Sequence, residues 1–246
     1  MKLFSDFRAG SFSHYTWLCD PALAEWLVRL LQPYGSSLLD VGCGNGYMLP
    51  FYAKNFKKVS AIDPSESLAP YVRQQLPAQV DFRVAPAEDI PFGNQTFDIA
   101  IAKSCLHHFM DERKGLDEMD RVSRSLVAVV EVVAPSDDCL PFLRNLLVRK
   151  EETRTPNTVY TIESIRKLLI ETEGVQQVHQ LLYDQYIDIN TWLYYSDLSE
   201  QRQQELREYI LSMDPATARH MQLHQRDGRD VMLRRMCLSL GLKKCG

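Results

Sequence analysis

The sequence of 246 residues predicts an α/β fold with a doubly wound, mostly parallel sheet of the Rossmann-like type. Short apolar runs alternate with segments of helical periodicity between residues 37 and 133, which is typical of parallel strands joined by helices. The first apolar run ends in an acidic residue and breaks into glycines at positions 42, 44 and 46. A glycine-rich turn between a strand and a helix lets the backbone approach a nucleotide-type cofactor closely.

The elements of this sheet follow in order along the chain. Asp20 is a favourable N-cap and Pro21 a favourable first residue for a helix that ends at Gly35. The apolar run at 97–102 is typical of a strand buried on both faces. Strands are expected at residues 37–41, 59–62, 80–84, 97–102 and 126–133, and helices at about 47–55, 67–75 and 117–122.

The pattern changes after Pro135, where further elements are expected on the same sheet. They are a helix at 140–150, a helix capped by Thr161 or Ser164, one long or two short strands at 175–189, a polar helix at 199–212, a short helix from Asp214, a hairpin turn at Asp227-Gly228 and a strand at 231–240. We expect a single domain over 1–246. Its parts are an N-terminal lid and helix (1–35), a cofactor-binding core (36–133), a region containing substrate-side insertions (134–228) and the final strand (229–246).

Composition narrows the classes of partner and compartment. The formal net charge is −4 and no basic cluster is present, which weighs against a nucleic-acid backbone as the main partner. No stretch is long and apolar enough to predict a membrane span, and the first residues turn polar before a signal-peptide core can form. The six cysteines show no Cys-x-x-Cys pair, so reduced thiols and a cytoplasmic location are expected.

The run Leu38-Leu39-Asp40-Val41-Gly42-Cys43-Gly44-Asn45-Gly46 carries the strongest functional signal. Asp63 follows about twenty residues after the turn, at the end of the second strand, where a carboxylate can accept two hydrogen bonds from a ribose diol. The alternative is that Asp63 is a turn acid before Pro64-Ser65. The glycine run resembles the first motif of class I S-adenosylmethionine (SAM)-dependent methyltransferases, and the resemblance implies that Asp40, residues 42–46, Asp63 and Pro64 bind SAM.

A second segment, residues 84–92, resembles the methyltransferase segment after the third strand. In the family, a backbone amide and a carboxylate at this place hold the adenine, and Ala87 and Glu88 match those positions. Pro86 departs from the pattern, because many relatives carry an acid there. The alternative for Glu88 and Asp89 is a pair of solvated loop acids.

A third segment, residues 97–109, resembles the family's fourth strand and the His-His step after it. The resemblance places Lys103 and Ser104 at the methionine end of the cofactor, largely through backbone atoms. His107 and His108 are candidate catalytic bases, since a neutral imidazole titrates in the useful range. The alternative is that they shape the loop and wall the pocket. Two adjacent histidines without other ligand-type residues predict no metal site.

Two further stretches extend the resemblance. Tyr15 occupies the place of an N-terminal tyrosine that folds over the sulfonium in similar methyltransferases, although it could equally cover an edge of the sheet. Residues 118–122 resemble the helix before the family's fifth strand, but Ser123-Arg124-Ser125 replaces the usual Pro-Gly-Gly turn.

The glycine run, Asp63 and the segments 84–92 and 97–109 together identify the chain as a member of the class I SAM-dependent methyltransferases, within the methyltransferase type 11 (UbiE-like) superfamily. The resemblance implies a seven-stranded sheet with the last strand antiparallel, and methyl transfer from SAM to a small-molecule acceptor, with His107, His108 and Tyr15 as the groups to test if the acceptor loses a proton. The alternatives are a non-catalytic SAM-binding protein or a nicotinamide-dependent oxidoreductase, for which the third glycine comes one residue early. The acceptor, the methylated atom and the oligomeric state stay open.

Overall fold

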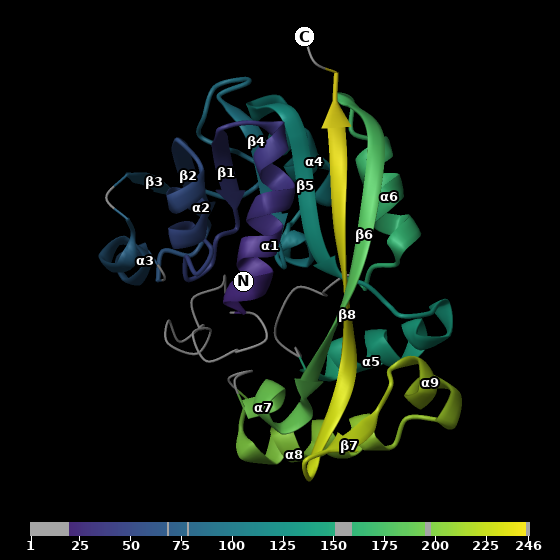
Figure 1. The fold of residues 1–246 in the computed structure, drawn as a ribbon. Helices are drawn as coiled ribbons and strands as arrows, with labels where there is room; N and C mark the ends of the chain where they lie inside the picture. Colours follow the sequence, from purple (N-terminus) through teal and green to yellow (C-terminus); the bar gives the residue numbers. More distant parts are fainter. Residues whose placement is uncertain (1–19, 68, 78, 151–158, 195–197, 245–246) are drawn as a thin grey trace.

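The computed structural model describes residues 20–67, 69–77, 79–150, 159–194 and 198–244. One mixed sheet forms its centre, with helices on both faces (Figure 1). The strands are β1 (Ser37–Val41), β2 (Lys58–Asp63), β3 (Val80–Val84), β4 (Phe97–Lys103), β5 (Ser123–Val132), β6 (Val175–Asp188), β7 (His224–Arg226) and β8 (Arg229–Lys243). The helices are α1 (Pro21–Leu31), α2 (Leu49–Asn55), α3 (Ala69–Gln75), α4 (Glu112–Val122), α5 (Leu140–Lys150), α6 (Ile162–Ile170), α7 (Ile189–Tyr194), α8 (Glu200–Leu211) and α9 (Pro215–His220), with 3₁₀ turns η2 (Gln32–Tyr34), η3 (Leu106–His108) and η4 (Asp137–Cys139).

The sheet has the strand order β3-β2-β1-β4-β5-β8-β6, with β7 paired to the start of β8. Strands β1 to β5 are parallel, and β8 runs antiparallel between β5 and β6. The predicted seven strands with an antiparallel last strand are confirmed, and the three-residue β7 adds an eighth. The order reverses between β1 and β4, so the ligand crevice of this fold lies outside the carboxyl ends of those two strands.

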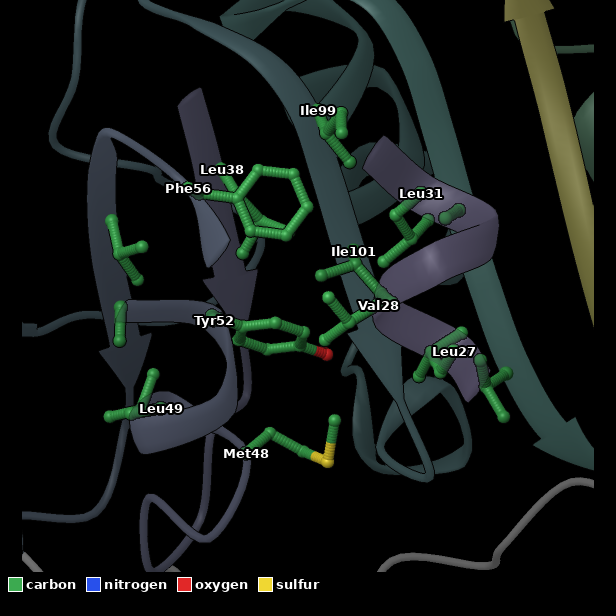
Figure 2. Close-up of a cluster of buried hydrophobic side chains, with 14 of the residues drawn as sticks. Leu27, Val28, Leu31, Leu38, Met48, Leu49, Tyr52, Phe56, Ile99 and Ile101 are labelled. Carbon is green, nitrogen blue, oxygen red and sulfur yellow. The ribbon is translucent and has the colours of Figure 1, made fainter. Parts of the chain in front are cut away.

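Two apolar cores cover the two faces of the sheet. On one face, α1, α2 and α3 pack on β1 and β4, and Figure 2 shows the ring of Tyr52 from α2 lying between Val28 of α1 and Leu38 of β1. On the other face, α4 and α6 contribute Leu116 and Ile165 to the second core. Burial on both faces explains why the central strands have apolar runs rather than alternating patterns.

A third core lies at the far end of the long β6–β8 ribbon (Figure 1). Strand β6 pairs with β8 along its whole length, from Val175 to Asp188. The pairing continues well beyond the point where β5, at Val132, stops pairing with β8. Helices α5, α7, α8 and α9 gather on this extension, which we call the cap lobe. Its buried apolar residues are Cys139, Leu146, Ile187, Ile189, Leu193, Leu206, Ile210, Met221 and Met232.

Most predicted elements are present, and the differences have local causes. Helix α4 begins at Glu112 rather than 117, because the Asp111 side chain accepts a hydrogen bond from the Lys114 amide and caps it. Thr161 rather than Ser164 caps α6, although both take part in a reciprocal capping box.

Some strands also differ from the predicted ranges. The segment predicted at 175–189 is a single strand, and the Asp227-Gly228 turn has the positive φ angles, 52° and 73°, of a tight hairpin. Strands β5 and β8 are longer than predicted at their starts, at Ser123 and Arg229. None of the helices in the described ranges has the length and apolar character that a bilayer crossing needs.

Candidate active site

The glycine turn connects β1 to α2 in a left-handed backbone conformation. Gly42, Gly44 and Gly46 have φ angles of 71°, 56° and 78°, which favour glycine. The amides of Gly42 and Cys43 both donate to the Ile62 carbonyl oxygen, at 2.8 and 3.0 Å. A Cβ atom on Gly42 would lie 2.8 Å from the Cys105 Sγ, whereas one on Gly44 would meet no atom within 4 Å. Packing therefore requires Gly42, while Gly44 faces space that a ligand can enter.

Asp63 holds the glycine turn against the end of β2. Its Oδ2 accepts from the Gly44 amide at 2.8 Å and its Oδ1 from the Ser65 amide at 2.9 Å. Burial raises the pKa of Asp63, and the two amides oppose part of that rise. Each carboxylate oxygen has a further acceptor site, so Asp63 can brace the turn and still receive a ribose hydroxyl. Pro64 after it is exposed.

Asp40 lies beneath the glycine turn at the switch point of the sheet. It is 3% exposed and pairs with Ile101 of the neighbouring β4. Burial raises the pKa of Asp40 to about 7; the Lys103 charge lowers it and the Asp63 charge raises it. The crevice thus contains a carboxyl group that changes charge near neutral pH.

Ser104 directly follows β4 at the same edge. Its φ angle is 55°, which is uncommon for a residue with a side chain, and its amide donates to the Val130 carbonyl oxygen at 2.7 Å. Its Oγ is buried and has no hydrogen-bond partner among the described residues. A buried hydroxyl without a partner costs free energy, so this atom is suited to meet a ligand. Asn45 in the opposing turn accepts from the Tyr47 amide at 3.1 Å, which fixes that turn.

The predicted adenine segment lies along the start of α4. Ala87 is buried, and the Glu88 Oε1 accepts from the amides of Met110 and Asp111, at 2.6 and 3.1 Å. Glu88 is therefore not a freely solvated loop acid, whereas Asp89 is exposed.

Helix α4 holds this segment through a second set of contacts. The Glu118 Oε2 accepts from the Ile90 amide at 2.9 Å, and Arg121 donates to the carbonyl oxygens of Ile90 and Phe92 at 3.0 and 2.8 Å. Arg121 also pairs with Glu118 at 2.6 Å. These contacts of Glu118 and Arg121 were not predicted from the sequence, because no spacing rule connects residues 118–121 with residues 90–92.

His107 is joined to an acid that the sequence reading passed over. Its Nδ1 lies 2.8 Å from the Oε2 of Glu131, which is 1% exposed near the end of β5. Burial acts to raise the pKa of Glu131, but His107, the Val132 amide and the Arg234 charge together hold that pKa below its usual value. The sequence signal was the acid itself, because a charged residue inside the apolar run 126–133 is rarely buried without a partner.

The remaining predictions concern His108, the cysteines, the N-terminal lid and metal binding. The His108 ring lies beside that of His107, with centroids 4.1 Å apart and planes tilted by 49°. The thiols of Cys43, Cys105, Cys139 and Cys237 are free, and Cys105 donates to the Val41 carbonyl oxygen at 3.0 Å. Tyr15 and the rest of the predicted lid before residue 20 lie outside the described residues. In the described ranges, no three His, Cys, Asp or Glu side chains are grouped as metal ligands.

Comparisons with known proteins agree with this geometry. Residues 39–129 match the family model described as a methyltransferase domain. The O-methyltransferase cnsE of Penicillium expansum is 36% identical over 115 residues, which are 44% of this chain and 42% of that protein. The O-methyltransferase resE of Aspergillus sclerotiorum is 29% identical over 191 residues, 70% of this chain and 71% of that protein.

The YcgJ protein of Bacillus subtilis adds a comparison in three dimensions. Its sequence, that of an uncharacterized methyltransferase, is 27% identical over 161 residues, 63% of this chain and 59% of that protein. Its crystal structure superposes with a TM-score of 0.78 over 92% of this chain and all of that chain, at 16% identity. Alignments to cnsE and YcgJ thus span about half of those curated relatives, and the structural likeness shows the fold.

The strand order, with β8 inserted antiparallel between β5 and β6, is a methyltransferase fold. Residues 39–129 form a methyltransferase domain of type 11, and the homologues of the chain are class I SAM-dependent methyltransferases. SAM is the cofactor of that family. The residues present fit it, because Gly44 faces open space, the Ser104 hydroxyl has no partner in the described structure, and two buried carboxyl groups lie at the adjoining strand ends.

Proposed function

We propose that the chain transfers the methyl group of SAM to a small-molecule acceptor by in-line displacement, with release of S-adenosylhomocysteine. The observation that carries the proposal is the glycine turn, braced by Asp63 and open at Gly44, inside a methyltransferase domain. Relatives named as acting on small molecules support the acceptor class, among them an ajmaline N-methyltransferase and a demethylmenaquinone methyltransferase. The net charge of −4 also disfavours a nucleic-acid acceptor.

The cofactor contacts divide among four strand ends. We assign the ribose to Asp63, the adenine to the Ala87 backbone and Glu88, and the methionine portion to Asp40, Lys103 and Ser104. Residues 42–46 lie against the nucleoside through their backbone. When bound, SAM supplies an electrophilic methyl group on a sulfonium. The protein then has to position the two reactants and exclude water.

His107, His108 and Tyr15 are the groups proposed to take a proton from the acceptor. Of the two histidines, His107 has the better support, because a buried carboxylate orients its ring. In the alternative, the histidines only wall the pocket, and their replacement would change acceptor affinity rather than the rate of the chemical step.

A SAM-binding protein without methyl transfer is the second candidate. Pro86, which stands where many relatives carry an acid, favours it. The fold also serves other chemistry, because the structure of the [4+2]-cyclase SpnF superposes with a TM-score of 0.55 at 18% identity. Fold alone therefore does not establish the reaction.

Calorimetric titration with SAM, S-adenosylhomocysteine and NAD tests the cofactor site. We expect the two sulfur ligands to bind and NAD not to bind. Asp63→Asn should weaken SAM binding by about ten- to hundredfold, because a hydrogen bond to a charged group contributes about 1.5–3 kcal/mol. The asparagine keeps one oxygen for the Gly44 or Ser65 amide, so folding should change less than binding.

Asp184→Asn is the matched control, since Asp184 on β6 pairs with Arg235 on β8, away from the glycine turn. Normal SAM affinity in Asp63→Asn would remove Asp63 from the cofactor site. Binding of NAD alone would move the turn to the oxidoreductase alternative.

A further inference from the structure

We propose that Glu131 is a positioning residue that fixes His107 as the general base for an acceptor hydroxyl group, so that the chain methylates oxygen on a phenol-like acceptor. The inference rests on the proposed methyl transfer and deepens it by naming the acceptor class. It starts from the Nδ1–Oε2 contact of 2.8 Å between His107 and Glu131.

The charge state of Glu131 determines which nitrogen of His107 carries the proton. The Val132 amide donates to the Glu131 Oε1 at 2.8 Å, while the Oε2 faces His107. An ionised carboxylate only accepts hydrogen bonds, so the Nδ1 of His107 must donate. In the neutral ring the Nε2 then holds the lone pair and is the nitrogen that can accept a proton.

A structural role alone does not account for an acid at position 131. The neighbours Val129, Val130 and Val133 are buried and apolar, so a valine would continue the strand without the cost of burying a charge. A buried ion pair contributes little to stability compared with apolar packing. The burial of an acid here, in contact with His107, therefore indicates a task performed on that imidazole.

The pair lies at the edge of the sheet where the chemistry is expected. Glu131 is the penultimate residue of β5, and His107 lies in the turn that follows β4, the strand ending at Lys103. The Glu131 side chain is 1% exposed and that of His107 is 20% exposed, so the imidazole can be reached while the acid cannot. At this edge the β6–β8 ribbon leaves the sheet and carries the cap lobe (Figure 1).

The charged and titratable groups around Glu131 come from every neighbouring element. Arg234 on β8 acts with His107 to keep Glu131 ionised. The negative charge of Glu131 in turn contributes to raising the pKa values of Cys105 and of Tyr183 on β6, for both of which burial is the larger cause. His108 packs on the His107 ring. The thiol and the phenol thus stay neutral, and the imidazole is the group of this cluster suited to take a proton.

An acceptor hydroxyl needs such a base, whereas a neutral amine already has a free electron pair. In the step proposed, the acceptor O–H bond breaks and its proton moves to the Nε2 of His107. The oxygen electron pair forms the bond to the methyl carbon, and the pair of the broken carbon–sulfur bond stays on sulfur. Glu131 remains ionised and balances the imidazolium that forms.

Nitrogen-15 NMR of the imidazole rings tests the positioning role without cofactor or acceptor. The imidazole signals that are missing from the spectrum of His107→Gln are assigned to His107. In the wild-type protein we expect His107 with the proton on Nδ1. Glu131→Gln, which can donate as well as accept, should shift His107 to a mixture of tautomers, while Glu205→Gln on exposed α8 should not. A wild-type ring protonated on Nε2, or a tautomer unchanged in Glu131→Gln, would overturn the proposal.

A rate assay with simple phenols and matched anilines tests the acceptor class. The quantity measured is the release of S-adenosylhomocysteine. We expect turnover of phenols, with kcat lowered about 10²- to 10⁴-fold by His107→Gln, lowered to a smaller extent by Glu131→Gln, and SAM affinity unchanged in both. A nitrophenol that is largely ionised at the assay pH should lose less, because it needs no base. Turnover of anilines without phenols would refute the hydroxyl assignment. If the wild-type protein did not bind SAM at all, that result would instead refute the proposed function.

Discussion

At the scale of single residues, Asp40 links the cofactor crevice to pH. Its carboxyl holds a proton more tightly in the folded protein, where its pKa is about 7, than in the unfolded chain, where a free aspartate has its ordinary pKa of 3.8. A raised pKa stabilises the fold at low pH, and this contribution is lost as the pH rises from about 4 through about 7. Each pKa unit corresponds to about 1.4 kcal/mol, so the effect reaches a few kcal/mol.

Replacement of Asp40 by asparagine should remove that dependence. Between pH 5 and 8, the free energy of unfolding of the wild-type protein is expected to fall relative to that of Asp40→Asn. Urea unfolding at several pH values measures the difference. Glu131, whose pKa is lowered, loses its contribution only at more acidic pH and stays constant in this window. Parallel profiles for the two proteins would contradict the assignment.

The sequence predicted site residues where a local rule applied and failed where the partner was distant. Asp63 could be predicted, because the glycine turn and the strand end lie in one short unit. The pairing of Glu131 with His107 could not, since the two residues are 24 positions apart and β4–β5 pairing brings them together. The left-handed backbone of Ser104, whose amide donates to the Val130 carbonyl oxygen, has no sequence signature either.

At the scale of elements, α4 supports both the segment 84–92 and the histidine turn. Gly115 lies on its buried face, where a Cβ atom would come 2.5 Å from the Phe109 ring and 3.4 Å from the Ala87 Cβ. The helix therefore approaches both segments as closely as its backbone allows.

Gly115→Ala tests this close approach. In a helix interior the exchange normally stabilises by about 1 kcal/mol. Overpacking costs about 1–3 kcal/mol, so we expect a net loss of stability of about 1 kcal/mol and weaker SAM binding. Thermal unfolding and SAM titration measure the two effects, with exposed Lys114→Ala as the control. A more stable Gly115→Ala protein would show that Phe109 moves aside freely.

Element boundaries were predictable for some elements and not for others. Strands β1 and β3 and helix α5 have the predicted bounds. Helix α4 begins in a polar stretch, so its apolar periodicity marks only its second half. Strand β8 is longer than its apolar run, because β7 pairs with Arg229 and Asp230 at its start and β6 pairs with Lys243 at its end. Residue type alone does not reveal these pairings.

At the scale of the whole molecule, the cap lobe has its own core and is joined to the sheet by the β6–β8 ribbon. Because the core of the cap lobe is separate from the two cores of the sheet, the cap lobe and the sheet can open with different free energies. Leu206 of α8 is 1% exposed in the cap core, so Leu206→Ala removes packing from that lobe alone.

Hydrogen exchange should locate this loss. We expect Leu206→Ala to lower the opening free energy of α7 and α8 amides by about 2–5 kcal/mol and to leave β1 and β4 amides unchanged. Val148→Ala, at a position 64% exposed, is the control. An equal loss in both regions would mean that the two cores unfold as one unit.

The place of β8 in the sheet also bears on how the chain is made. A ribosome synthesises β5 and β6 well before β8, yet these two strands meet only through β8. The nascent polypeptide therefore carries two unpaired strand edges, together with the helices of the cap lobe, until residues 229–243 emerge. Such edges invite pairing with other chains. Completion of the sheet therefore waits for the synthesis of β8, and these strand edges stay open to other chains until then.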